Sequence, residues 1–113
     1  MPCLTVKTNI SNDQITDDFL KQLSALLAKA VGKPEQYIAV QVSGDEKLFF
    51  SGTNQPAAVM ELVSIGLSGN QTTGISKQVM TFFEEKLHIK SERIYIKFTD
   101  VPGNMMGWNK GTF

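Results

Sequence analysis

The fold is decided by the stretch DDFLKQLSALLAKAVG (residues 17–32) and by what stands on either side of it. Its apolar residues recur every three or four positions, which predicts one face of a helix. The two aspartates at its start, with Asp13 before them, suit the first turns of a helix, and Gly32 suits its C-terminal cap. Residues 3–8 alternate polar and apolar side chains and are rich in β-branched residues, which predicts a strand. A second strand is predicted over residues 37–42, so the first half is a strand–helix–strand unit.

The second half of the chain repeats this order of elements. Residues 59–65 predict a strand, and residues 66–74 form a loop rich in Gly, Ser, Asn and Thr. Another strand is predicted at 94–98, and a short additional one at 47–50. A helix precedes the last strand, with one apolar face made of Ile75, Val79, Phe82, Phe83 and Leu87. We interpret the chain as one domain, 1–113, with pseudo-repeats of about 1–56 and 57–113.

Two such units predict an α/β (α+β) fold, in which a four-stranded mixed sheet carries both helices on one face. Each unit is expected to have the usual right-handed crossover. The other face of the sheet is too apolar to be left bare and too polar for a dry core. It comprises Thr5, Lys7, Ala39, Gln41, Glu61, Val63, Tyr95, Lys97 and Thr99. Partial burial against other subunits would resolve this, so we expect a homo-oligomer.

Composition narrows the classes of function. Eleven basic and eleven acidic residues cancel, whereas proteins that bind nucleic acids or membrane surfaces usually carry a basic excess. No apolar run approaches the ~18 residues of a membrane span, and no basic-then-apolar signal peptide stands at the start. The single cysteine, Cys3, has no partner for an internal disulfide, and we expect it to be a small core residue. A reducing cytoplasm is the expected compartment.

The residues Met1-Pro2 and Gly32-Lys33-Pro34 suggest a chemistry. A methionine before a small residue is usually removed, which would leave Pro2 with a free secondary amine. An apolar pocket or a nearby cation such as Lys33 lowers the pKa of an amine, because both disfavour its charged form. A neutral amine at physiological pH is what a general base requires.

Several further motifs point to a known family. They are Thr8-Asn9, Gln36-Tyr37-Ile38-Ala39-Val40, Ser64-Ile65-Gly66, Arg93-Ile94-Tyr95-Ile96, Gly107-Trp108-Asn109 and Thr112-Phe113. Together with the two motifs above, in this order and spacing, the chain resembles the macrophage migration inhibitory factor family of the tautomerase superfamily, nearly from end to end. The resemblance implies a homotrimer with a central channel and with sites between adjacent subunits.

The resemblance also implies an activity and its residues. Pro2 would be the base of a keto–enol tautomerase that acts on phenylpyruvate-like compounds without metal or cofactor. Lys33 would bind the substrate carboxylate, and the backbone of Ser64 and Ile65 would contact the ligand. Apolar walls would come from Tyr37, Tyr95, Met106, Trp108 and Phe113, with Tyr95 supplied by the neighbouring subunit.

Some positions depart from the family's vertebrate cytokine. Lys97 stands where the cytokine has an asparagine that touches the substrate ring, which predicts a changed preference for ring substituents or acidic substrates. Met106 replaces a valine and should reshape the pocket floor. Ala57 and Met60 replace a Cys-x-x-Cys pair, so thiol oxidoreductase activity is not expected. Asn12 replaces a basic residue implicated in receptor contact.

Two other functions remain open from the sequence. The first is a secreted cytokine that binds a cell-surface receptor, exported by the family's unconventional route, with the pocket as a vestige. The second is a trimeric cytosolic protein whose pocket binds an unidentified metabolite.

Overall fold

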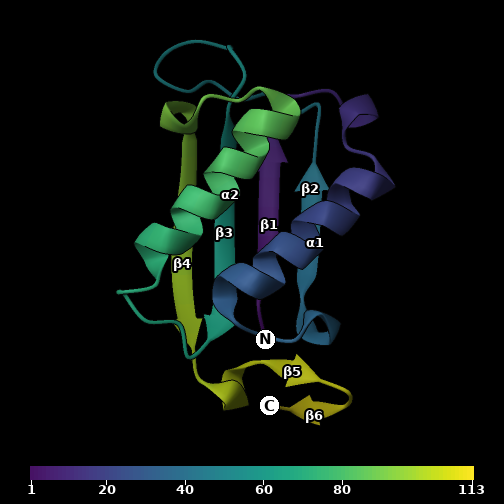
Figure 1. Cartoon of the computed structure of the whole chain (residues 1–113), viewed down its shortest axis with the longest axis vertical. Coiled ribbons are helices and arrows are strands. Elements are labelled where there is room, and N and C mark those ends of the chain that lie inside the picture. Colours follow the sequence, from purple (N-terminus) through teal and green to yellow (C-terminus); the bar gives the residue numbers. More distant parts are fainter.

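The computed structural model describes residues 1–113 and places two helices across one face of a four-stranded sheet (Figure 1). The helices are α1 (Asp17–Val31) and α2 (Thr72–Leu87). The strands of the sheet are β1 (Cys3–Thr8), β2 (Ala39–Ser43), β3 (Ala58–Ile65) and β4 (Ile94–Val101). The chain ends in a small hairpin of β5 (Gly107–Trp108) and β6 (Gly111–Thr112), close to the N-terminus (Figure 1).

The strand order, β2-β1-β3-β4, confirms the predicted mixed sheet. β1 pairs in parallel with β2, and β3 pairs in parallel with β4, so each pair encloses one helix in the chain. The two units join through the antiparallel pairing of β1 with β3 at the centre of the sheet. β2 and β4 are therefore both edge strands, and their outer backbone groups have no partner in the sheet.

Local chemistry sets where the helices begin and end. The Thr16 hydroxyl accepts a hydrogen bond from the Phe19 N–H at 3.1 Å, so α1 begins after Thr16. Asp13 lies in a separate 3-10 turn (Asn12–Gln14), and the expectation that it belongs to the helix is wrong. Gly32 ends α1 at φ 70°, as predicted. Neither helix has the length and apolar character to cross a bilayer.

The strand predicted at 47–50 is wrong. Residues 44–57, which connect β2 to β3, contain only an isolated bridge between Phe50 and Thr53. Side chains bond to two of its carbonyls, because Asn9 Nδ2 donates to the Leu48 oxygen at 3.5 Å and Arg93 Nη1 donates to the Phe50 oxygen at 2.9 Å. Asn9 Nδ2 also donates to the oxygens of Asn54 and Gln55, at 3.1 and 3.0 Å. The edges of other elements also shift, since β2 begins two residues later than predicted and α2 begins inside the predicted loop.

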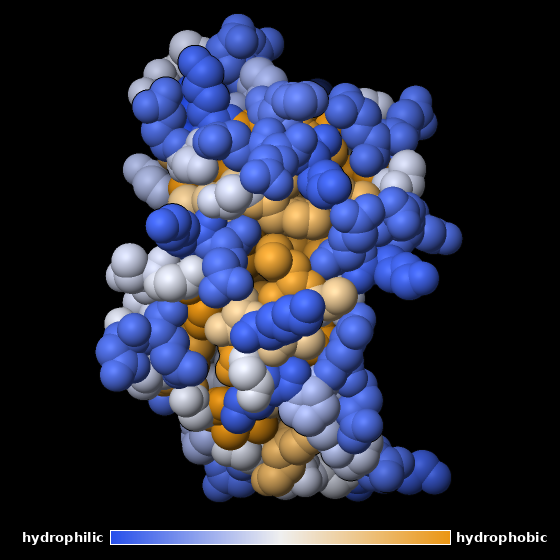
Figure 2. All heavy atoms as spheres, in the orientation of Figure 1, coloured by the Kyte–Doolittle hydropathy of each residue, from blue (hydrophilic) through white to orange (hydrophobic).

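One hydrophobic core lies between the helices and the sheet. Leu4, Val6 and Leu62 of the central strands face Leu23, Leu27, Val79 and Phe83 of the helices, and all seven are fully buried. Apolar side chains show as an orange band between the two helices, whose outer surfaces are hydrophilic (Figure 2). The opposite face of the sheet has no covering element, and its side chains are exposed or half-buried. Cys3 is half-buried on this open face and not in the core, which corrects the prediction for it.

The Thr8 side chain connects the end of β1 to the residue before β3 through a hydrogen bond. Its buried hydroxyl donates to the Ala57 carbonyl at 2.6 Å and accepts from the Ile10 N–H at 3.2 Å. Valine at this position would keep the shape but leave two backbone groups without partners. We expect Thr8→Val to lower the free energy of unfolding by about 2 kcal/mol. Urea unfolding followed by circular dichroism measures this, with Thr5→Val on the open face as the control that should change little.

Candidate active site

Pro2 directly precedes β1, near the N-terminus marked in Figure 1, and its side chain is fully buried. Its carbonyl accepts a hydrogen bond from the Ala39 N–H at 3.0 Å, which joins the N-terminus to the first residue of β2. Met1 is present in this structure. The nitrogen of Pro2 is consequently a peptide nitrogen, and the terminal amine belongs to Met1.

The electrostatic surroundings of this amine favour its neutral form. Burial lowers the pKa of the Met1 amine below its ordinary value, and the nearby Lys33 ammonium lowers it further. Lys33 is placed there by the end of α1, because the chain turns back at Gly32 in the left-handed conformation. At neutral pH, a smaller fraction of an amine at this end of the chain is therefore protonated than of an amine free in water.

A cavity of about 340 Å³ opens beside the N-terminus. Its lining is Met1, Lys33, Pro34, Tyr37, Ile65 and Phe113. The structure thus brings four of the predicted site residues together with the terminal amine, although they come from distant parts of the chain. None of the lining residues has an acidic side chain, so Lys33 is the only charged side chain on these walls. An apolar cavity with one cation and one amine suits a small organic anion.

The C-terminal tail contributes Phe113 to the lining of this cavity, whereas Met106 and Trp108, which were predicted as walls, are not among the lining residues. The rings of Trp108 and Phe113 stack at 5.3 Å between centroids, and the ring of Tyr37 meets both edge-on at 5.7 and 5.8 Å. The hairpin that places Trp108 turns through two residues of positive φ, Asn109 and Lys110, as a tight two-residue turn requires. The Phe113 N–H donates to the Met106 carbonyl at 3.2 Å, so Met106 anchors the tail by its backbone.

A second, more polar hollow of about 260 Å³ shares Lys33 and Ile65 with this cavity. Ser64 lies there, at the end of β3, with 2% of its surface exposed. Gln71 also lines this hollow, and sequence reasoning did not identify it. Pro34 was likewise missed as a lining residue, although it stands next to Lys33 in the Gly-Lys-Pro motif.

Tyr95 and Lys97 do not join this cavity within one chain. Tyr95 on β4 pairs with Val59 on β3, and Val59 pairs with Lys7 on β1. Tyr95 is therefore level with Lys7, which is five residues after Pro2. That is roughly 17 Å along the strand direction, with β3 in between. Lys97 lies opposite Glu61 on the same open face, and the Thr99 hydroxyl donates to that carboxylate at 2.8 Å.

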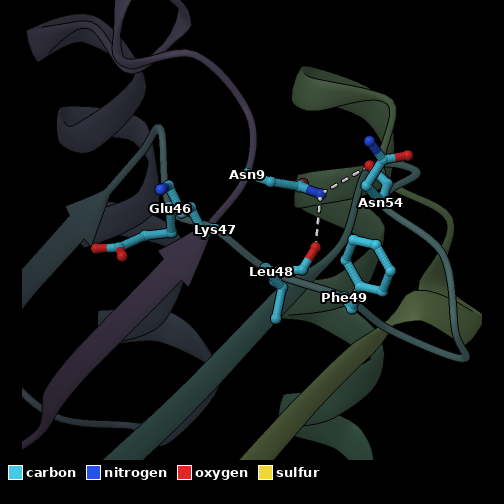
Figure 3. A pocket seen from close by; sticks show the side chains of 6 residues that line it. All are labelled: Asn9, Glu46, Lys47, Leu48, Phe49 and Asn54. Atoms are coloured by element: carbon cyan, nitrogen blue, oxygen red, sulfur yellow. Dashed lines mark hydrogen bonds between the residues drawn. The ribbon is translucent and has the colours of Figure 1, made fainter.

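The far end of the sheet carries a larger hollow, of about 550 Å³. Figure 3 shows its lining residues, which are Asn9, Glu46, Lys47, Leu48, Phe49 and Asn54. Asn9 points into the connection between β2 and β3 and bonds to its carbonyls (Figure 3). None of the predicted site residues lies here, so the candidate site stays at the N-terminal end.

Comparison with known proteins places this geometry in a family. The sequence profile described as macrophage migration inhibitory factor matches residues 1–113. The chain belongs to the macrophage migration inhibitory factor family. It is 42% identical to macrophage migration inhibitory factor of Mus musculus, over 100% of this chain and 99% of the relative. It is 39% identical to the macrophage migration inhibitory factor homolog of Trichuris trichiura, over 100% of both chains.

Solved structures of macrophage migration inhibitory factors share the fold. The factor from Trichinella spiralis superposes with a TM-score of 0.94 at 36% identity, over 98% of this chain and 99% of that one. The homologue from Prochlorococcus marinus gives a TM-score of 0.93 at 35% identity, over 98% of each chain. The predicted resemblance and the predicted fold class, that of the tautomerase superfamily, are thereby confirmed.

Proposed function

We propose that this protein is a keto–enol tautomerase for phenylpyruvate-type compounds, with Pro2 as the base once Met1 has been removed. The observation that carries this is the terminal amine, which is partly buried and lies beside Lys33 at an aromatic-lined cavity. Removal of Met1 would move the amine onto Pro2, whose ring is fully buried. Burial and Lys33 would then keep the secondary amine neutral.

The reaction needs only a proton carrier and a place for the substrate. The Pro2 nitrogen would take a proton from the carbon next to the ketone, which leaves an enolate. The same proton would return to the enolate oxygen to give the enol, and the reverse sequence would give the ketone. Lys33 would pair with the substrate carboxylate, while Tyr37, Trp108 and Phe113 would pack against its ring and exclude water. The backbone of Ser64 and Ile65 would close the other side.

The complete site is proposed to lie between two subunits of a homotrimer with a central channel. The uncovered face of the sheet and its two free edges favour association with further copies of the chain. Three large apolar side chains outside the cavity are each at least 69% exposed: Phe49, Tyr95 and Met105. Tyr95 would reach the site of the neighbouring subunit, and Lys97 would follow it. Sedimentation as a single chain would contradict this assembly.

The direct test is enolisation of phenylpyruvate by the processed protein, followed by ultraviolet absorbance. We expect turnover well above the buffer-catalysed rate, without added metal or cofactor. A processed and folded protein that gives only the buffer rate would contradict the proposed function.

Lys33→Gln tests the electrostatic part of the mechanism. The neutral amine is the active form, so the rate rises with pH through the pKa of the amine. Loss of the cation raises that pKa, so we expect the acidic limb of the profile of kcat/KM against pH to move to higher pH. We also expect KM to rise about fivefold, since an exposed ion pair contributes about 1 kcal/mol. Lys29→Gln removes an equal charge one turn earlier, outside the cavity, and should change neither quantity.

A second candidate function is suggested by the names of the relatives, which describe an action on macrophages. The protein would then be a secreted ligand of a cell-surface receptor, exported from the cytoplasm by an unconventional route, with a vestigial pocket. Binding to receptor-bearing cells that is equal for wild type and Pro2→Gly would support it. Absence of binding by the wild type would remove it.

A further inference from the structure

Arg93 holds together a segment that has almost no secondary structure of its own. Residues 44–57 connect β2 to β3 with a single isolated bridge. The guanidinium of Arg93, which stands just before β4, donates to four carbonyls of this segment. Its acceptors are the oxygens of Pro56, Phe50 and Gln55, each at 2.9 Å, and that of Thr53 at 3.4 Å. Four of the five N–H groups that an arginine offers are therefore used here.

Phe50 connects this anchor to Tyr95. The Arg93 guanidinium carbon lies 5.4 Å from the centre of the Phe50 ring, within the range of a cation–π contact. The Phe50 ring also contacts the ring of Tyr95, with 4.7 Å between the ring centroids and 48° between the ring planes. Arg93 therefore contacts Phe50 twice, through a hydrogen bond to its carbonyl and through the cation–π contact with its ring.

The side chain of Tyr95 is mostly exposed, so few contacts can fix its conformation. It lies on the edge strand β4, on the open face, with 69% of its surface exposed. An exposed tyrosine on an edge strand can rotate among staggered χ1 conformers. The Phe50 ring is the one aromatic ring in contact with it, so it selects among these conformers.

We propose that Arg93 is a positioning residue that sets the Tyr95 ring by way of Phe50. This rests on the proposed function, in which Tyr95 forms part of the aromatic wall of the neighbouring subunit's site. Arg93 touches neither the substrate nor the base. Its effect is on how well the wall fits an aryl substrate, and therefore on binding more than on proton transfer.

Arg93→Lys separates positioning from charge. Lysine keeps the positive charge but is a point donor that cannot bridge four carbonyls. We expect KM for phenylpyruvate to rise about fivefold with kcat changed less than about twofold, the pattern of lost binding without lost chemistry. In protein with labelled tyrosine, we expect the ring resonances of Tyr95 to move and broaden without any substrate present.

Asn9→Ser is the matched control. Asn9 holds the same segment, through the carbonyls of Leu48, Asn54 and Gln55 and the N–H of Ala57, but none of its hydrogen bonds is to Phe50. We expect lower stability with unchanged KM and unchanged Tyr95 resonances. If both variants shift KM and the resonances equally, the role of Arg93 is only structural and the proposal is wrong.

Two further results keep the test decisive. Phe50→Leu removes the ring but leaves the backbone bonds of Arg93, and it should reproduce the Tyr95 shift even if Arg93→Lys does not fold. Unmoved Tyr95 resonances in Phe50→Leu would overturn the proposal. If the wild type shows no tautomerase activity but the resonances move as expected, the positioning holds and the proposed function alone fails.

Discussion

Replacing Pro2 with glycine should lower kcat/KM for phenylpyruvate enolisation by about a hundredfold, at the low end of what a general base contributes. Glycine keeps a terminal amine, but this amine is primary. It also lacks the proline ring, which restricts the motion of the nitrogen. The fold should persist, because the carbonyl at this position still accepts from the Ala39 N–H. Steady-state kinetics of the two proteins, after circular dichroism has verified folding, measure the effect. Equal rates would remove Pro2 as the base.

A preparation that retains Met1 is the matched control for this experiment. Its Pro2 nitrogen is an amide without basic character, and its terminal amine lies one residue away from the expected position. We expect it to show only background turnover, although every side chain of the cavity is present. Intact mass, lower by one methionine in the processed form, assigns each preparation. Full activity with Met1 retained would contradict the mechanism as clearly as an active Pro2→Gly variant.

The parts of the fold that follow local rules could be predicted from the sequence. The strand at 3–8 is observed as Cys3–Thr8, because its alternation reports which side chains face the core. Gly32 was predicted as a cap, and it adopts the positive φ that such a cap needs. Both features depend on a few neighbouring residues, so a short stretch of sequence contains the information.

Features that depend on distant partners could not be predicted in this way. The segment 47–50 has the composition of a strand, but Asn9 and Arg93 take carbonyls of the segment around it. The hairpin near Trp108 depends on packing against Tyr37, about seventy residues earlier. The grouping of Lys33, Ile65 and Phe113 was anticipated through the family resemblance, since no local pattern connects them. The placement of Tyr95 in a neighbour's site stays a prediction.

Mixing two impaired variants should restore activity if each site draws on two subunits. Tyr95→Ala removes the wall that one chain would lend to the next, and we expect it to lower kcat/KM about tenfold. Pro2→Gly removes the base. After the two are unfolded together and refolded in equal amounts, a site is complete when one subunit provides Pro2 and its neighbour provides Tyr95. Random assembly makes about a quarter of the sites complete, so activity should rise to about a quarter of the wild-type value.

The control for this recovery is the same mixture left without unfolding, whose subunits do not exchange. It should show only the average of the two variants, about one-twentieth of the wild-type rate from the tenfold and hundredfold losses expected of each. If the refolded mixture also stays at this average, the base and the aromatic wall belong to one chain or Tyr95 has no part in the site. Because Tyr95 lies roughly 17 Å from the level of Pro2 within a chain, the first explanation conflicts with the register of the sheet. An average result would thus remove Tyr95 from the site and leave the cavity of Lys33, Tyr37 and Phe113 to bind the substrate alone.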